Sequence, residues 1–107
     1  MAKAADVRAR GSARRVTRAA MAEFLPLHAF ELVAHMPGFG LATLRVRWFG
    51  RDYGPQPFTR WRARKAAICA ATGARIKPGD AIYAPVTNRS FRGVRVLAAF
   101  VEGQACR

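Results

Sequence analysis

The chain has 107 residues, which is enough for one ordinary domain and too few for two. Hydrophobic residues make up 51% of it and aromatic residues 10%, a composition that excludes general disorder. A balance of 19 Lys and Arg against 6 Asp and Glu gives a formal net charge of +13, so a polyanion is the expected partner.

Cysteine use and hydropathy indicate the compartment. The chain has 2 cysteines, and its first residues lack the pattern of a secretory signal peptide. No uncharged apolar run approaches the roughly 20 residues that cross a bilayer. We therefore expect a cytoplasmic protein that does not enter a membrane.

Residues 1–22 predict a flexible basic arm ahead of a single domain at 23–107, because alanine dominates them and leaves little bulk to bury. Ser12 fits the N-cap of a short helix from residue 13 to about 24, so the arm could order on a partner. An organellar targeting peptide is the alternative for this segment. The charged residues of the predicted arm are Lys3, Asp6, Arg8, Arg10, Arg14, Arg15 and Arg18.

A helix is expected at residues 26–36. Pro26 suits a first helical turn, and Pro37-Gly38 ends the element. The apolar residues between them approximate a stripe of period 3.6, namely Leu27, Phe30, Val33, Ala34 and Met36.

Residues 43–49 predict the clearest strand. Leu44, Val46 and Trp48 alternate with Arg45 and Arg47, so the two sets face opposite ways. The following loop, residues 50–57, is rich in Gly and Pro and is expected to reverse the chain.

At residues 58–70 charged and uncharged side chains alternate with a period of two, which favours a strand. A helix is the alternative, because Arg and Ala both have high helix propensity. A strand would place Trp61 inside together with Trp48. The sequence Lys77-Pro78-Gly79-Asp80 fits a type II turn between short strands near residues 75–76 and 81–83.

The last segment has both helical and alternating spacing. Phe91, Val94, Ala98 and Val101 form a helical stripe behind Ser90, whereas Val94 to Phe100 also alternate as in a strand. We favour a helix at 90–101. The expected fold class is therefore α+β, with a small antiparallel sheet at about 42–84 packed with the two helices and preceded by the basic arm.

An ordered series of motifs runs through the middle of the chain: Trp48, Arg60-Trp61, Ala63-Arg64, Cys69-Ala70-Ala71-Thr72-Gly73, Ile76, Gly79-Asp80, Tyr83 and Pro85. Over about residues 41–85 it resembles an uncharacterised proteobacterial family, a domain of unknown function with an aromatic strand, then Cys-Ala-x-Ser/Thr-Gly, then Gly-Asp-x-aromatic. The resemblance implies a compact α+β domain and supplies no catalytic residue, cofactor or substrate. The loop at residues 52–55 departs from the Cys- and His-containing loop of some members, which puts a metal site there in doubt.

The arginines are the strongest functional signal. If the strands at 43–49 and 58–65 pair, their arginines share one sheet face, and a phosphate backbone would offset the repulsion between them. Guanidinium groups suit phosphates because they present forked donors and keep their charge. The predicted nucleic-acid-binding residues are Arg45, Arg47, Arg60, Arg62 and Arg64 on the sheet, with Arg14, Arg15 and Arg18 on the arm.

Other chemistry has weaker support. On a helix, His28, Glu31 and His35 would share one face at spacings that can bind a metal, with Cys69 or Cys106 as a further ligand, but a solvent-facing polar stripe explains them more simply. Cys69 is better explained as a small buried hydrophobe. No residue couples a nucleophile to a base, so neither catalysis nor a cofactor is predicted.

The function predicted from the sequence is non-catalytic binding of nucleic acid, DNA or RNA, through the arginine face and the arm. The alternative is an interaction or regulatory module that docks an acidic protein through exposed Phe39, Tyr53 or Phe91 beside the arginines. A metal-dependent role at the histidines is a distant third.

Overall fold

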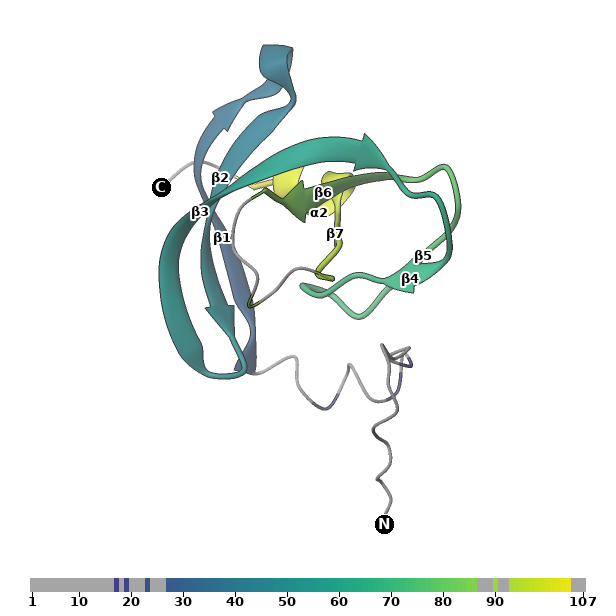
Figure 1. The fold of residues 1–107 in the computed structure, drawn as a ribbon, viewed down its shortest axis with the longest axis horizontal. Helices are drawn as coiled ribbons and strands as arrows, with labels where there is room; N and C mark the ends of the chain where they lie inside the picture. Colours follow the sequence, from purple (N-terminus) through teal and green to yellow (C-terminus); the bar gives the residue numbers. More distant parts are fainter. Residues whose placement is uncertain are drawn as a thin grey trace.

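The computed structural model describes residues 17, 19, 23, 27–86, 90 and 93–104. Within these ranges the chain forms a curled five-stranded antiparallel sheet in the order β1-β2-β3-β6-β7 and a two-stranded sheet, β4-β5 (Figure 1). The elements are β1 (Ala29–Met36), a 3-10 turn η2 (Pro37–Phe39), β2 (Leu41–Trp48), β3 (Arg51–Arg62), β4 (Ala67–Ile68), β5 (Arg75–Ile76), β6 (Ala81–Pro85), β7 (Val96–Leu97) and α2 (Ala98–Glu102).

The expected α+β class is wrong, because the described fold is mostly sheet and its C-terminal helix has only five residues. The predicted helix at 26–36 is also wrong, since Ala29–Met36 is strand β1, paired with β2. A β-bulge between Leu32 and Ala34 shifts the register. The extra residue interrupts the alternation of period two, which makes the apolar spacing look helical.

The core lies on the inner face of the curled sheet. Strand β2 shows the predicted alternation, with Leu44 and Val46 fully buried and Arg45 and Arg47 exposed. Strands from both halves of the chain fill the same core, whose largest fully buried side chains are Tyr83, Phe58, Leu32, Leu44, Ile76, Val46, Val96, Val101 and Cys69.

The chain reverses earlier than expected, at Phe49 and Gly50, and residues 51–57 belong to β3 instead of a loop. Both turn residues have positive φ, 52° and 79°, as in the two-residue turns that suit the twist of a hairpin.

Two prolines lie inside β3 without breaking it. Pro55 and Pro57 pair with Arg45 and Thr43 of β2. The Pro57 carbonyl accepts a bond from the Val86 N–H at 3.1 Å, so the backbone of Pro57 faces away from β2. By the alternation of the strand, Pro55 faces the same way, and neither missing N–H is needed by the β2 ladder.

The strand predicted for residues 58–70 is confirmed as far as Arg62, where β3 ends. Trp61, however, does not point inward, because its side chain is 60% exposed. The turn at residues 77–80 is confirmed as well: the Asp80 N–H donates to the Lys77 carbonyl at 3.0 Å, and Gly79 has φ 93°.

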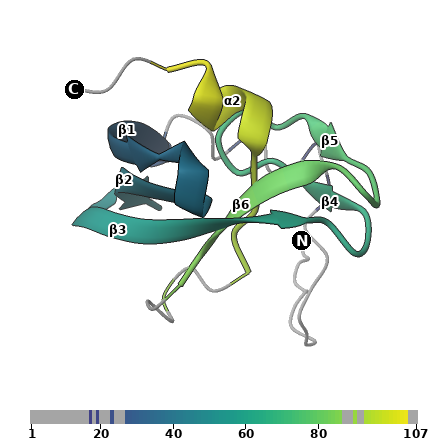
Figure 2. The ribbon, with the colours of Figure 1, turned by 90° about the horizontal axis from the view of Figure 1, so that it is seen from above.

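The predicted helix at 90–101 is too long. Residues 96–97 form β7, which pairs with β6, and the helix α2 occupies only Ala98–Glu102, beside β6 (Figure 2). Gln104, just after α2, lies at the outer edge of β1. Its side-chain amide donates to the Phe30 carbonyl at 3.2 Å and accepts from the Leu32 N–H at 3.1 Å.

The predicted arm at 1–22, with the short helix at 13–24, falls outside the described residues except for Thr17, Ala19 and Glu23. Among the described helices, none has the length and apolar character needed to cross a membrane.

Gly79→Ala tests the left-handed turn. An added Cβ would meet nothing within 4 Å, so the cost is that of forcing φ 93° on an L-residue, about 1 to 2 kcal/mol of unfolding free energy. Gly38→Ala is the matched control, because its site is equally open and its backbone is not left-handed. Denaturant unfolding of both variants measures the difference in their unfolding free energies. Equal stability of the two variants would contradict the left-handed conformation of Gly79.

His28 predicts a pH dependence of stability. It is buried, stacks on Trp48 at 4.0 Å between ring centroids and accepts the Phe49 N–H at Nδ1, 3.1 Å. Burial lowers the pKa of His28 below 6.5. The imidazole of the unfolded chain therefore binds a proton more readily than the buried imidazole of the folded protein. The stabilisation that the neutral His28 side chain gives is complete above about pH 6.5 and is lost as the pH falls below that value. Thermal melts between pH 7.5 and 5 should show this loss, and His28→Gln should reduce the slope.

Candidate nucleic-acid interface

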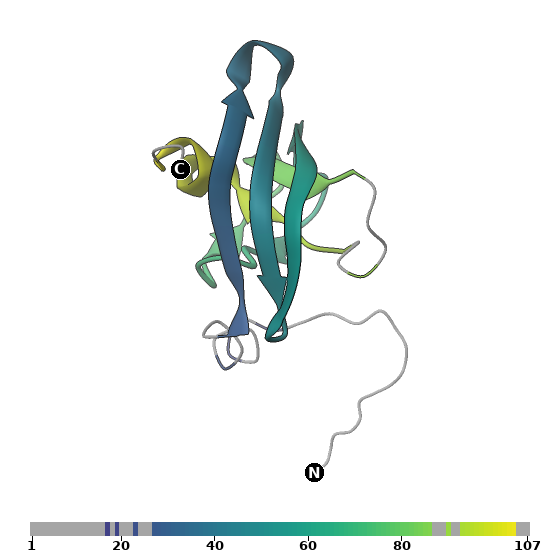
Figure 3. The same ribbon diagram turned by 90° about the vertical axis from the view of Figure 1, so that its left-hand side faces the viewer.

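The predicted single face of arginines does not form. Figure 3 looks onto the face of β1, β2 and β3 opposite the core, which we define as the outer face. Arg45 and Arg47 lie on this face, because they are exposed and alternate with the buried Leu44 and Val46. Phe58 pairs with Ala42, and both side chains are buried. Arg60 is two residues further along β3, so its side chain points to the same side of the sheet as that of Phe58. Arg60 therefore lies on the opposite side of the sheet from Arg45 and Arg47.

Arg45 and Arg47 each lie opposite an acidic residue in the sheet. In the register of the strands, Arg45 pairs with Glu31 of β1, and Arg47 pairs with Asp52 of β3. Opposite charges at such positions interact favourably across strands. The positive potential of these two arginines is therefore reduced locally, which the sequence order did not reveal.

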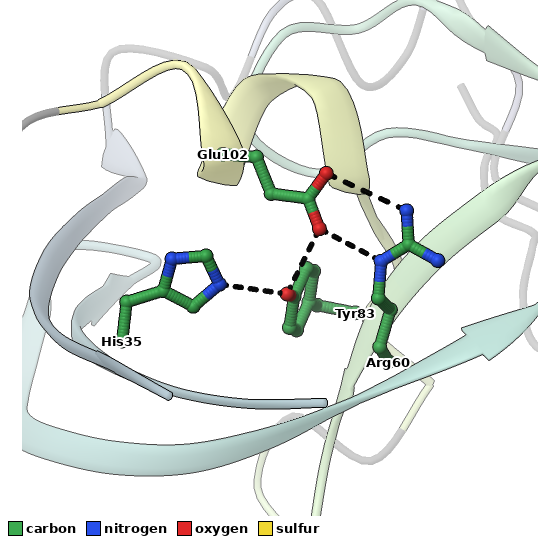
Figure 4. A network of polar contacts seen from close by, with 4 residues as sticks. All are labelled: His35, Arg60, Tyr83 and Glu102. Atoms are coloured by element: carbon green, nitrogen blue, oxygen red, sulfur yellow. Dashed lines mark hydrogen bonds and ion pairs between the residues drawn. The ribbon is translucent and has the colours of Figure 1, made fainter. Parts of the chain in front are cut away.

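Arg60 belongs to a polar network that joins β1, β3, β6 and α2 (Figure 4). Its Nε donates to Glu102 Oε2 at 2.7 Å, and its Nη2 lies 3.5 Å from Oε1. The Tyr83 hydroxyl donates to Glu102 Oε2 at 3.0 Å and lies 3.1 Å from His35 Nε2. Because the hydroxyl proton goes to the carboxylate, His35 must donate through Nε2.

The electrostatics of this network suit a structural role. The bond from Arg60 holds the pKa of Glu102 below its usual value, which keeps the carboxylate charged. Burial, assisted by the bond to Glu102, raises the pKa of Tyr83, which keeps the phenol protonated. The network links α2 to the sheet, and Glu102 largely compensates the positive charge of Arg60 within the fold.

Cations instead gather where two loops lie side by side. The Ala63 N–H donates to the Asp80 carbonyl at 2.8 Å, and the Gly79 N–H donates to the Ala63 carbonyl at 2.7 Å. These bonds hold the connection after β3 against the turn before β6, to the right in Figure 1. Five exposed cations belong to the end of β3, to these two segments or to β5, which leads into the turn, and we call this region the basic corner: Arg62, Arg64, Lys65, Arg75 and Lys77.

The basic corner has little negative charge of its own. Residues 62–81 contain one acidic residue, Asp80, and its Oδ2 accepts the backbone N–H of Lys77 at 2.8 Å. Arg62 donates through Nη1 to the Gly79 carbonyl at 3.0 Å, which fixes its guanidinium beside the turn. The corner thus presents several cations at the pairing of β3 with β6.

Two of the predicted arginines, Arg62 and Arg64, belong to this corner, but the sequence analysis missed Lys65, Arg75 and Lys77. Two features of the sequence could have revealed these residues, namely the adjacent charges of residues 62–65 and the predicted turn at 77–80. To place these two segments side by side, one must know that Arg62 pairs with Ala81, a contact between residues distant in sequence.

The other predicted site residues do not come together. His28 precedes β1, Glu31 lies on its outer face, and His35 lies on its inner side. Cys69 is fully buried and accepts the Leu97 N–H at 3.3 Å, in line with the prediction of a small buried hydrophobe. Among the described residues, no group of three or more His, Cys, Asp or Glu side chains could hold a metal ion. Cys106 and the arm residues Arg14, Arg15 and Arg18 lie outside the described residues.

The aromatic residues predicted for protein docking differ in exposure. Phe39, at the tip of the β1–β2 hairpin, is 76% exposed, whereas Tyr53 packs partly against the core. Phe91 lies outside the described residues.

Comparison of the chain with protein-family models, with curated proteins and with solved structures gives no significant match in any of the three. The resemblance to the uncharacterised proteobacterial family stays a prediction.

A double-mutant cycle tests the coupling of Arg60 to Glu102. The two side chains are 40% and 35% exposed, so solvent screens the pair and its contribution to stability should be small. Arg60→Gln, Glu102→Gln and the double variant, unfolded in denaturant at pH 7, give this coupling. Because the pKa of Glu102 is lowered, the contribution should be present above about pH 4.5 and fade as the pH falls through the folded pKa. Additive effects at pH 7 would contradict the pair.

Proposed function

We propose that the protein binds nucleic acid without catalysing a reaction, and that the basic corner is the principal contact of its folded part. The observation that carries this proposal is the pairing of β3 with β6, together with the backbone bonds of Ala63 to Gly79 and Asp80, which bring the cations at 62–65 beside the turn that begins at Lys77. Like charges held this close repel one another, and a chain of phosphates would offset that cost.

The chemistry of the corner fits a phosphate backbone. Arginine offers forked donors that match phosphate oxygens, and lysine supplies a compact charge. Contacts of this kind position a polyanion without reading its sequence. The predicted arm, with Arg14, Arg15 and Arg18, would extend the contact.

The proposal ranks the arginines predicted from the sequence. Arg62 and Arg64 are central, because they lie in the basic corner. Arg45 and Arg47 should contribute less, since each lies opposite an acidic residue, and Arg60 least, since it is paired with Glu102.

Docking of an acidic protein is the second candidate, and the β1–β2 hairpin favours it. Phe39 is joined there by exposed Met36 and Leu41, and a shallow apolar depression lies between Met36 and Pro57. Exposed apolar surface of this kind often marks a protein contact. If a protein is the partner, a random copolymer of glutamate and tyrosine should bind at least as tightly as an oligonucleotide of equal charge, and Phe39→Ser should weaken that binding.

The salt dependence of binding to a single-stranded oligonucleotide tests the principal proposal. Neutralising about five phosphates gives a slope of log K against log salt near −3.5. The triple variant Arg62→Ala/Arg64→Ala/Lys65→Ala should flatten the slope by about 2.

The matched control is Arg45→Ala/Arg47→Ala/Arg51→Ala, which removes the same charge from outside the corner. It should change the slope much less. Equal effects of the two triple variants would show that net charge alone drives binding, and the absence of any salt-sensitive binding would overturn the proposal.

A further inference from the structure

Trp61 is exposed in a way that the fold does not explain. Its side chain is 60% exposed, in the strand that also supplies Phe58 to the core. Trp48, by contrast, stacks on His28 and packs against the core. A large aromatic group left in solvent forgoes the stabilisation that burial would give, and its surface is available to a partner.

The indole is also held in place. Its Nε1–H donates to the Thr59 Oγ1 at 2.6 Å, two residues earlier on the same face. Thr59 lies in the middle of the sheet, opposite Leu41 of β2 and Ala84 of β6. This bond satisfies the polar atom of the ring and limits its rotation, so that an aromatic surface is presented to solvent in a restrained position.

Trp61 borders the basic corner. Arg62 is the next residue of β3, so its side chain points to the opposite face of the strand from the indole. Just beyond the end of β3, the backbone of Ala63 is fixed to the turn at Gly79 and Asp80. Arg64 lies just after the end of β3, and even a fully extended chain at about 3.3 Å per residue would put it no more than roughly 10 Å from Trp61. A nucleotide chain bound at the corner that continues past the end of β3 would therefore come within reach of the indole.

We propose that Trp61 is a stacking platform for an unpaired nucleobase, so that the partner of the basic corner is a single-stranded nucleic acid. The inference rests on the function proposed above and specifies its substrate class. Single-strand binding combines a positive path for the phosphates with aromatic rings on which bases stack. Bases inside a duplex are already stacked on one another and do not offer their faces to a side chain.

The test compares oligothymidylate with a DNA duplex of the same length for the full chain and its Trp61→Ala and Trp61→Phe variants. Trp61→Ala should weaken oligothymidylate binding between about 5-fold and 150-fold, the effect of one stacked base. Trp61→Phe should keep most of the affinity. Duplex affinity should not change in either variant, and because stacking is not ionic, the salt slope should stay the same.

Fluorescence gives an independent readout. Oligothymidylate should quench the tryptophan emission of the original chain, and Trp61→Phe, which retains Trp48, should lose this quenching. Thr59→Val removes the acceptor of the indole N–H and should weaken single-strand binding while leaving the duplex unaffected. Thermal melts check that the variants remain folded, which the exposure of Trp61 leads us to expect.

The outcomes separate the two proposals. If the oligonucleotide binds with a salt slope that depends on the corner, but Trp61→Ala binds it as well as the original chain, the stacking inference is wrong and the proposed function stands. Equal affinity for duplex and single strand would also overturn the inference. If neither nucleic acid binds, the proposed function itself fails, and the stacking inference fails with it.

Discussion

The structure depends on the way β3 is shared between two partners. Its first part pairs with β2, and its last residues, Phe58 to Arg62, pair with β6. The overlap of these two ladders curls the sheet and brings Tyr83 of β6 beside Arg60. The same pairing brings the turn at 77–80 beside Ala63, so the core, the polar network and the basic corner follow from one set of backbone bonds.

The fold could be predicted where local chemistry decides it. Strand β2 alternates apolar and charged residues, and the turn at 77–80 needs Gly at the position of positive φ, so both were readable from the sequence. Strand β1 was not, because its bulge hides the alternation. The start of β3 was missed because Pro55 and Pro57 resemble loop residues, and only the pairing shows that their backbone faces away from β2.

The site was only partly predictable for a related reason. Alternation correctly placed Arg45 and Arg47 away from the core, but which acidic residues lie beside them depends on the register with β1 and β3. The bond from Arg60 to Glu102 joins residues 42 positions apart. Sequence patterns report the side of a strand, whereas the free charge of a side chain depends on neighbours that only tertiary structure supplies.

Gln104 has a consequence for the edge of the sheet. As an outer strand, β1 presents backbone donors and acceptors to which a strand of another molecule could add. The amide of Gln104 occupies the Phe30 carbonyl and the Leu32 N–H, as a neighbouring strand would. A single side chain thus shields the first half of this edge from intermolecular β-pairing, a guard against aggregation that complements the mutual repulsion of such highly charged molecules.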